Sequence, residues 1–504
     1  MRIGEMLGAL SLATDLAAGL PLEASLRTCI VATHLARTLG LAELGEVRRA
    51  TLLRHLGCTA FAHEAARLGG NDHDMLAAYA GVDAGKRSAV LGRTMTRLAR
   101  GEKLGRRIAT VARVAANPGA GKALVGAQCA QAVALAGDLA MPAGVVATLG
   151  QIYERHDGRG GPHRVAGDEL RPAARLLHVA ELVEICHRTQ GRDAAAAEVA
   201  RRRGRHLAPE ACDAFLAEQG ALWDVLEAAS VWDLYLDADE PDEPGLDAER
   251  VARAFGRYAD LKSPAMLGHS TAVAELAVAA APSREPAAVA RLRIAALLHD
   301  RGTVSVPNGI WDKPGPLNAA EWERVRLHAY HTQRILAQTP QLAEVAVIAG
   351  AHHERLDGGG YHRAIDGQML SAEARVLAAA DAYQAMQQAR PYRPARSPDA
   401  AADALAADAA AGKLCRRAVD AVLGAAGRPA PERPLPGGLT PREVEVLVHL
   451  ARGRTNKEIA QALGIAVRTT NHHVEHIYAK IDVTTRAAAA LFAVRHDLVD
   501  VTRA

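Results

Sequence analysis

The feature that most constrains the fold of this chain is an internal repeat with a constant spacing of 200 residues. Residues 154–158 (ERHDG) recur as residues 354–358 (ERLDG), and residues 174–177 (ARLL) recur as residues 374–377 (ARVL). A chance similarity between alanine-rich helices would not be expected to keep one register across two such stretches. We therefore predict a duplicated domain in which two lobes share one fold.

The composition favours an all-α protein. Almost half of the 504 residues are apolar but only 3% are aromatic, and much of the apolar content is alanine, a strong helix former. Alternating β-branched runs with turn signals are scarce. A chain of this length also exceeds what one hydrophobic core usually spans, so several domains are expected.

Charge, cysteine usage and hydropathy narrow the cellular context. The net charge of +3 is close to neutral, so any contact with nucleic acid must be local. The six cysteines form no C-x-x-C pair, which argues against a zinc ribbon or a disulfide framework and fits a reducing compartment. No apolar run approaches the ~20 residues of a membrane helix. We expect a cytoplasmic protein without a membrane partner.

Two segments have the composition of linkers. Residues 237–247 are acidic and contain proline, and residues 427–438 are rich in proline and glycine. They divide the chain into an N-terminal lobe, a middle lobe and a C-terminal domain, with predicted bounds of 1–236, 248–426 and 439–504.

The middle lobe carries an unusual set of polar residues on apolar helices. Unpaired, each would cost free energy on burial, and a lone histidine in such a place is usually packed and hydrogen-bonded in the core. Imidazoles and carboxylates from several helices satisfy one another best around cations, and nitrogen with oxygen ligands suits iron, manganese, zinc or nickel. A carboxylate such as Asp300 can bridge two metals, which together hold a hydroxide and an ester phosphate. The set is His269, His299, Asp300, His328, His352, His353 and Asp381.

With these residues in place, the middle lobe resembles the HD-GYP subgroup of the HD phosphohydrolases over residues 251–424. The matching motifs are His299-Asp300, Val306-Pro307, residues 313–317 (KPGPL), residues 352–361 (HHERLDGGGY), Asp381 and residues 390–393 (RPYR). The resemblance implies hydrolysis of a cyclic dinucleotide such as cyclic di-GMP, and it places the family's metal ligands on the seven residues above. It also implies two divalent transition metals, with iron or manganese favoured over zinc or nickel. Substrate contacts would come from Gly360, Tyr361, Arg390 and Arg393.

The sequence departs from the family at three positions. Thr303 replaces the lysine of the HD-x-GK motif, His362 replaces the proline of GYP, and Ala265 replaces a glutamate that supplies a third metal site in some members. Two metals are therefore the most we expect. We assign catalytic positions to Asp300 and Thr303, and the missing lysine makes turnover less certain than metal binding. An arginine nearby, Arg301 or Arg355, could supply the missing charge.

The N-terminal lobe repeats this frame without the same ligands. Leu56 replaces the aspartate of the HD pair, and Arg27 falls near the position of His269. Ile152 and Tyr153 stand for His352 and His353, and Glu181 stands for Asp381. We interpret this lobe as a degenerate HD-GYP-like copy that regulates or dimerises the middle lobe.

The last domain shows the pattern of a helix-turn-helix. Thr440 is a predicted N-cap, followed by Pro441 and by Glu443 at the third helical position. A second helix is expected from Asn456, a tight turn at Gly464, and a third helix from about Arg468 to Lys480. Two short helices around a glycine turn, packed on a scaffold helix, bind duplex DNA in many regulators.

Residues 439–504 resemble the LuxR-type helix-turn-helix family, through LTPRE at 439–443, TNKEIA at 455–460, and Leu463, Val474 and Ile477. The resemblance makes Lys457 a phosphate contact. It places Arg468, Thr469, Asn471, His472 and Glu475 on or beside the recognition-helix face. The domain is only slightly basic, so a homodimer on paired half-sites is expected.

The sequence thus predicts a DNA-binding regulator whose HD-GYP-like lobe is a metal-dependent cyclic dinucleotide phosphodiesterase. The alternative is a lobe that binds metal and nucleotide without turnover and controls the helix-turn-helix domain. A transcription factor with a relict structural core is a third possibility, which the retention of every ligand disfavours.

Overall fold

In a computed structural model, the structure describes residues 3–69, 71–83, 85–97, 104–116, 119–237, 247–428, 435–496 and 498–499. These residues form helices and loops without a strand, apart from two isolated bridges, so the all-α prediction is confirmed. None of the described helices is both long and apolar enough to cross a membrane. Most of the predicted linker residues, 238–246 and 429–434, lie outside the described parts.

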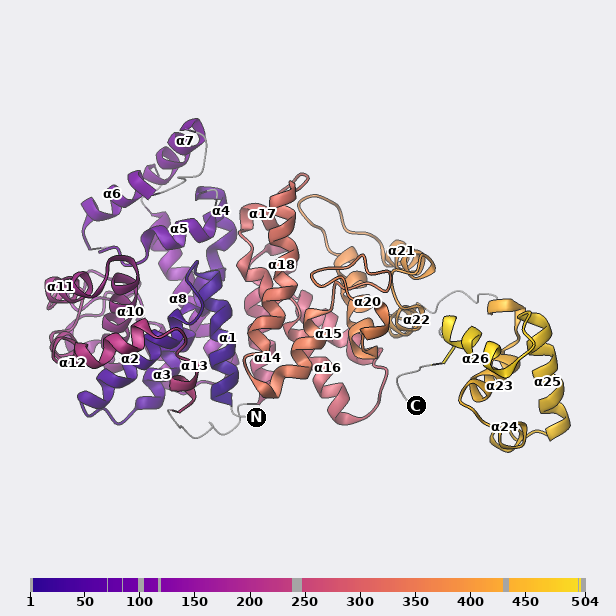
Figure 1. Cartoon of the computed structure of the whole chain (residues 1–504). Coiled ribbons are helices and arrows are strands. Elements are labelled where there is room, and N and C mark those ends of the chain that lie inside the picture. The colour runs from indigo at the N-terminus through magenta and orange to yellow at the C-terminus, as the bar shows by residue number, and fades with distance from the viewer. Residues whose placement is uncertain are drawn as a thin grey trace.

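The N-terminal lobe is drawn in indigo to magenta in Figure 1. Helices α6 and α7 project from its body. Its helices are α1 Ile3–Ala17, α2 Ala24–Thr38, α3 Leu44–Leu53, η1 Arg54–Phe61, α4 Ala62–Gly69, α5 Asp72–Tyr79, α6 Arg87–Arg97, α7 Leu104–Ala115, α8 Ala120–Asp138, α9 Ala143–Leu149, η2 Gly167–Glu169, α10 Pro172–Gln190, α11 Arg192–Arg202, α12 Pro209–Glu227 and α13 Trp232–Leu236.

The middle lobe lies beside it, with α1 of the first lobe packed against α14 and α18 of the second (Figure 1). Its helices are α14 Ala248–Asp260, η3 Pro264–Met266, α15 His269–Ala279, α16 Pro286–Leu298, η4 Arg301–Ser305, α17 Asn308–Trp311, α18 Ala319–Leu336, η5 Pro340–Leu342, α19 Ala343–Gly350, η6 Gly367–Met369, α20 Ala372–Gln387, α21 Pro398–Ala410 and α22 Arg416–Ala425.

The two lobes repeat each other in helix order and in detail. The pairs α9 with α19, η2 with η6 and α10 with α20 keep the spacing of 200 residues at their first residues. Asp15 accepts hydrogen bonds from the backbone N–H and hydroxyl of Ser25, and Asp260 accepts the same two bonds from Ser270. The prediction of tandem lobes is therefore confirmed.

The lobes share buried contacts. Apolar residues of both, among them Leu10 and Phe255, belong to one continuous core. Asp72 of the N-terminal lobe forms a buried ion pair with Lys262 of the middle lobe, at 3.2 Å between Oδ2 and Nζ. Thr59 donates a hydrogen bond to the backbone carbonyl of Tyr258 across the same boundary. These contacts join the lobes into one unit.

The C-terminal domain contains α23 Pro441–Ala451, α24 Asn456–Leu463, α25 Val467–Lys480 and α26 Arg486–Arg495, after the short η7 Pro436–Gly438. Thr440 and Glu443 form a capping box at the start of α23, and Thr455 and Glu458 form another at α24. Gly464 ends α24 with a φ of 65°, which glycine adopts without steric cost. The helix-turn-helix prediction is confirmed, with α24 and α25 as its two helices.

Candidate functional site

All seven predicted metal ligands converge at one place in the middle lobe. His269 begins α15, the pair His299-Asp300 follows the end of α16, and His328 lies within α18. The pair His352-His353 follows the end of α19, and Asp381 lies within α20. Six of the seven are buried, and the side chain of His353 remains 29% exposed. Five helices thus bring ligands that are distant in sequence to a centre with one open side.

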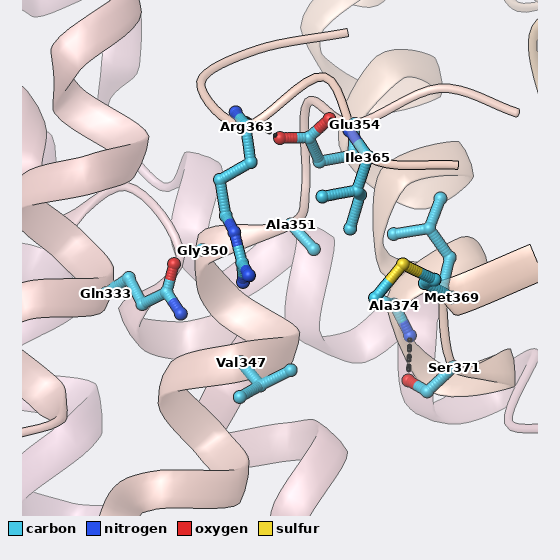
Figure 2. A pocket seen from close by; sticks show the side chains of 11 residues that line it. Gln333, Val347, Gly350, Ala351, Glu354, Arg363, Ile365, Met369, Ser371 and Ala374 are labelled. Carbon is cyan, nitrogen blue, oxygen red and sulfur yellow. Dashed lines mark hydrogen bonds between the residues drawn. The ribbon is translucent and has the colours of Figure 1, made fainter. Parts of the chain in front are cut away.

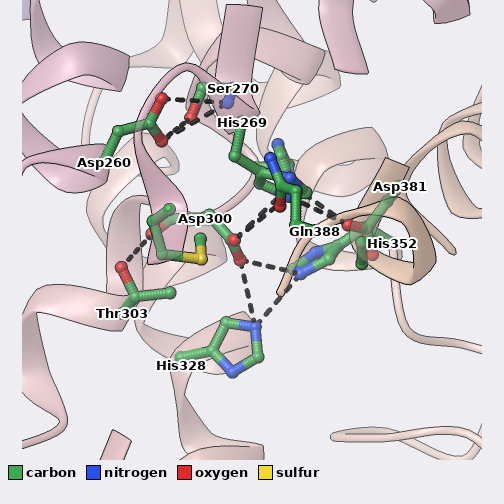
Figure 3. A network of polar contacts seen from close by, with 12 residues as sticks. Asp260, His269, Ser270, Asp300, Thr303, His328, His352, Asp381 and Gln388 are labelled. Atoms are coloured by element: carbon green, nitrogen blue, oxygen red, sulfur yellow. Dashed lines mark hydrogen bonds and ion pairs between the residues drawn. The ribbon is translucent and has the colours of Figure 1, made fainter. Parts of the chain in front are cut away.

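The carboxylate of Asp300 lies between two groups of imidazoles (Figure 3). Its Oδ1 is 3.3 Å from Nε2 of His328 and 3.4 Å from Nε2 of His352. Its Oδ2 is 3.7 Å from Nε2 of both His269 and His299. Each oxygen therefore faces a different pair of ring nitrogens, as a carboxylate bridging two cations would.

Asp381 completes the second group. Its Oδ1 is 3.1 Å from Nε2 of His269 and 3.7 Å from Nε2 of His299. Its Oδ2 is 3.7 Å from Nδ1 of His353, the ligand candidate nearest to solvent. One group holds Asp300, His328, His352 and His353, and the other holds His269, His299 and Asp381.

Backbone carbonyls orient three of the imidazoles for metal binding. His299, His328 and His352 each direct Nδ1 at the backbone carbonyl three residues earlier, with distances of 2.7 Å for His299 and His352. A ring that donates its Nδ1 hydrogen presents Nε2 as a lone-pair ligand, the usual arrangement around a bound metal. Nε2 of His299 is buried without a hydrogen-bond partner, and this orphaned nitrogen fits a cation.

The electrostatics of the cluster also suit cations. Burial alone would raise the pKa of Asp300 and of Asp381, but the imidazoles around them hold both pKa values well below the usual range. Burial lowers the pKa of His353 well below its usual value. Burial would also lower the pKa of His299, but the two carboxylates raise it to about 9. The ionised carboxylates are ready to ligate metal, whereas a cation at Nε2 of His299 would displace the proton that the two carboxylates hold there, because imidazole ligates metal in its neutral form.

A buried threonine occupies the position of the family's lysine. Thr303 is 2% exposed, and its hydroxyl donates to the backbone carbonyl of Asp300 at 2.7 Å. Neither expected substitute cation faces the cluster. Arg301 is buried and donates to the carbonyls of Phe255 and Leu10, and Arg355 is paired with Asp357. In this structure, therefore, neither Arg301 nor Arg355 replaces the charge of the missing lysine.

The four predicted substrate-contact residues differ in how free they are to contact a ligand. Gly360 allows a close backbone approach, because a Cβ there would meet Cα of Glu354 at 2.5 Å. The ring centroid of Tyr361 lies 4.6 Å from that of His353. Arg393 donates to the carbonyls of Ala385, Met386 and Gln388 at the end of α20, and Arg390 contacts Met266 and Gln388. Tyr361 is thus the best placed of the four for a ligand.

Sequence reasoning did not single out Trp322 and Arg326, which lie on α18 close to Tyr361. The ring centroids of Trp322 and Tyr361 are 6.3 Å apart, and the guanidinium carbon of Arg326 is 5.9 Å from the centroid of Tyr361. Their separation of four residues puts them on one helix face, but only the fold brings that face against Tyr361.

The N-terminal lobe corrects two of our alignments. The Asp15–Ser25 and Asp260–Ser270 pairs set a spacing of 245 residues for the first helices of each lobe. By this spacing His55, not Leu56, corresponds to Asp300, and Ala24, not Arg27, corresponds to His269. The sequence analysis placed these two residues without the Asp–Ser contacts, which fix the register of the first helices.

At the position of His299 the N-terminal lobe carries Arg54. Its Nε lies 3.5 Å from Oε1 of Glu181, the counterpart of Asp381, and its Nη1 donates to Ser25 and to the carbonyl of Thr51. A fixed guanidinium therefore stands beside the remaining carboxylate. None of the His/Asp groups found among the described residues lies in this lobe.

A separate depression lies beside the end of α19 (Figure 2). It encloses about 300 Å³ of space that includes open solvent. Arg363 extends across it towards Gln333 and Gly350, and the backbone N–H of Arg363 donates to the carboxylate of Glu354 at 2.7 Å. None of the seven candidate ligands lines it, so it is distinct from the cluster.

The candidate DNA contacts all lie on the surface of the C-terminal domain. On α25, Arg468, Thr469, Asn471, His472 and Glu475 are exposed, and Lys457 is exposed near the start of α24. Asn456 of α24 donates to Asn471 of α25 at 2.8 Å, which ties the two helices together. Positions 468, 471, 472 and 475 follow helical spacing, so one face of α25 carries them.

The comparisons with known families agree with this arrangement. The family described as HD domain matches residues 253–414, and the family described as bacterial regulatory proteins, luxR family, matches residues 438–493. The chain therefore contains an HD domain and a C-terminal domain of the luxR family. Both families predicted from the sequence are confirmed.

Several relatives of this HD-domain protein have curated functions. It is 29% identical to 3'3'-cGAMP-specific phosphodiesterase 3 of Vibrio cholerae, over 79% of this chain and 89% of the relative. It is 37% identical to the cyclic di-GMP phosphodiesterase response regulator RpfG of Xanthomonas campestris, over 34% of this chain and 46% of the relative. A further relative, the uncharacterised transcriptional regulatory protein YhcZ of Bacillus subtilis, is 50% identical over 12% of this chain and 28% of the relative. The first of these similarities spans both lobes.

A crystal structure of a cyclic GMP-AMP-specific phosphodiesterase from V. cholerae has the same fold. It superposes with a TM-score of 0.57 over 85% of this chain and 98% of the other, at 24% identity. The two-lobe architecture therefore occurs in a solved structure.

Proposed function

We propose that the middle lobe is a metal-dependent phosphodiesterase that hydrolyses a cyclic dinucleotide, and that the C-terminal domain binds duplex DNA. One observation carries the enzymatic part. Asp300 faces two pairs of imidazoles with its two oxygens, and Asp381 serves the second pair. The relatives of this HD domain that act on cyclic GMP-AMP or cyclic di-GMP support the choice of substrate.

The cluster would hold two divalent cations. His328, His352, His353 and Asp300 would bind one, and His269, His299 and Asp381 would bind the other with the second oxygen of Asp300. Iron or manganese suits this nitrogen-rich, sulfur-free donor set, and zinc or nickel is the alternative. When bound, such cations lower the pKa of a water ligand and polarise a phosphoryl oxygen.

The protein's own residues define the rest of the site. The carbonyls of Ala296, Val325 and Ala349 fix the orientation of three imidazoles. Burial of the centre excludes water from all sides except that of His353 and Tyr361, so a substrate would enter there. Gly360 lets its loop pass close to Glu354 and sets Tyr361 beside His353.

Incubation of metal-replete protein with a panel of cyclic dinucleotides, followed by chromatography, tests this function. Wild-type protein should yield a linear dinucleotide or mononucleotides. Asp300→Ala should lose both metal and turnover, because the bridging oxygens disappear. His55→Ala, at the matching position of the N-terminal lobe, is the control and should keep both. Absence of metal after reconstitution would end the proposal.

A sensor without turnover is the second candidate, and the surroundings of Thr303 favour it. The Thr303 hydroxyl donates to the backbone carbonyl of Asp300. Arg301 points away from the cluster and donates to the carbonyl of Phe255. A protein that binds a cyclic dinucleotide with full metal occupancy and yields no product would identify the sensor.

The DNA-binding part rests on the exposed face of α25 and on Lys457. As a homodimer the chain would contact two half-sites, each through one recognition helix. Selection from a random duplex library with the full chain should recover a sequence with two-fold symmetry. Recovery of unrelated sequences would contradict specific binding.

A further inference from the structure

An exposed tryptophan stands at the rim of the metal cluster. Trp322 lies on α18, six residues before His328, and 46% of its surface is exposed. Its ring is linked to the cluster through Tyr361, at 6.3 Å from Trp322 and 4.6 Å from His353 between ring centroids. A large aromatic side chain normally loses most of its surface to the core, so an exposed one beside a cluster of candidate metal ligands indicates a binding surface.

A cation shares this rim. Arg326 follows Trp322 by one helical turn, and its guanidinium carbon lies 5.9 Å from the ring centroid of Tyr361. It forms an ion pair with Glu323 at 3.3 Å, between side chains that are 46% and 67% exposed. An exposed pair of this kind contributes little, so the planar guanidinium can turn to stack on another ring.

The duplication supplies an internal comparison. At the spacing of 200 residues, the N-terminal lobe has Lys122, Gly126 and Gly161 where the middle lobe has Trp322, Arg326 and Tyr361. That lobe also has Gln128, Ile152 and Tyr153 in place of three histidines of the cluster. The aromatic rim and the candidate ligands are therefore present together in one lobe and absent together from the same positions of the other. Nothing in helix packing requires this, because both lobes keep the same helices.

We propose that Trp322, Tyr361 and Arg326 form a platform on which a purine base of the substrate stacks while its phosphodiester reaches the cluster beside His353. This inference rests on the proposed function and adds the residue that recognises the nucleoside part. Aromatic side chains can stack on any base, because every base has a π-face, and guanidinium groups add a cation–π contribution. A two-ring purine covers more of the indole than a one-ring pyrimidine does, so the platform favours purines.

The test compares full-length Trp322→Ala, Trp322→Phe and the control Leu327→Ala, all loaded with the same metal. Leu327 lies on the same helix and is 43% exposed, so its substitution matches the loss of an exposed apolar side chain. The measurements are metal content, KM and kcat for cyclic di-GMP and cyclic di-UMP, and Kd for both ligands under conditions that prevent turnover.

For cyclic di-GMP, Trp322→Ala should raise KM and Kd by roughly 5- to 150-fold, the range found when one stacked base loses its aromatic partner. Metal content and kcat should stay at the wild-type level, Trp322→Phe should recover most of the affinity, and the effect on cyclic di-UMP should be smaller. Leu327→Ala should behave as wild type.

Equal affinity of Trp322→Ala and wild type for cyclic di-GMP would overturn the platform, as would loss of metal in the alanine variant with no recovery in Trp322→Phe. Wild-type protein that binds cyclic di-GMP without hydrolysis would remove the enzymatic proposal, and Kd would still decide the platform. Wild-type protein that binds neither nucleotide would refute both.

Discussion

The buried ion pair between Asp72 and Lys262 allows a quantitative test of whether the lobes act as one unit. The side chains are 1% and 3% exposed, and Asp72 also accepts the backbone N–H of Asn308 at 2.8 Å. Burial alone would raise the pKa of Asp72, but Lys262 and the neighbouring donors lower it, so the carboxylate is ionised in the folded protein. Asp72 therefore joins α5 of the N-terminal lobe to the loop after α14 and to the first residue of α17 in the middle lobe.

Asp72→Ala leaves the ammonium of Lys262 buried without its partner and removes the acceptor of the Asn308 N–H. Removal of one member of a buried pair costs about 3–5 kcal/mol. Asp72→Asn combined with Lys262→Met removes both charges together and should cost much less, since a desolvated pair contributes little net stability. The free energy of unfolding is measured from urea titrations followed by circular dichroism.

Asp213→Ala is the matched control, because Asp213 pairs with Arg203 at 2.7 Å on the surface, where the side chains are 56% and 46% exposed. Its urea midpoint should not differ from wild type. The reasoning is refuted if Asp72→Ala shifts the transition no further than Asp213→Ala, or if the double variant is as unstable as the single one. Metal content should also fall in Asp72→Ala, because Lys262 lies just before the helix that begins with His269.

Three further predictions concern catalysis, DNA binding and pH. Thr303→Lys should increase the rate of cyclic di-GMP hydrolysis up to about 10²-fold if the ammonium reaches the phosphate, since one preorganised charged group is typically worth that much; an unchanged initial rate at full metal occupancy would count against it. Lys457→Ala should weaken binding to all duplex sequences and reduce the slope of log affinity against log salt by about 1, whereas Lys413→Ala, in the middle lobe, should not. Burial would raise the pKa of Glu443, but Lys480 and the backbone and hydroxyl of Thr440 lower it to about 2. The stability that this carboxylate confers is therefore full above pH 4.5 and is lost as pH falls towards 2. Glu443→Gln should remove that part of the acid transition measured by circular dichroism.

Much of the site could be predicted from the sequence because its residues violate the local pattern. Histidines and aspartates that interrupt apolar helices, such as His299 and Asp381, are costly unless they meet partners, so they could be recognised singly. Their convergence depends on the chain topology, which local patterns do not reveal. The resemblance to the family implied it. The platform residue Trp322 carried no such signal, since an exposed aromatic on a polar helix face is not distinguishable from an ordinary surface residue until Tyr361 is placed beside it.

The register of the N-terminal lobe shows the same limit. The sequence analysis matched Leu56 to the aspartate of the HD pair, but the side-chain contact between Asp15 and Ser25 fixes the match one residue away, at His55. A cap depends on three-dimensional geometry at a helix end, which a short alignment does not contain.

By itself the sequence determined the helical class, the duplication, the seven candidate ligands and the helix starts of the C-terminal domain, because periodicity, capping residues and motif spacing are local properties. Only the tertiary structure decided which way side chains point. It bonded the Thr303 hydroxyl to the backbone carbonyl of Asp300, turned Arg301 into the boundary between the lobes and placed Arg54 beside Glu181. Each of these outcomes depends on contacts between segments far apart in the chain, and packing, not local preference, selects among them.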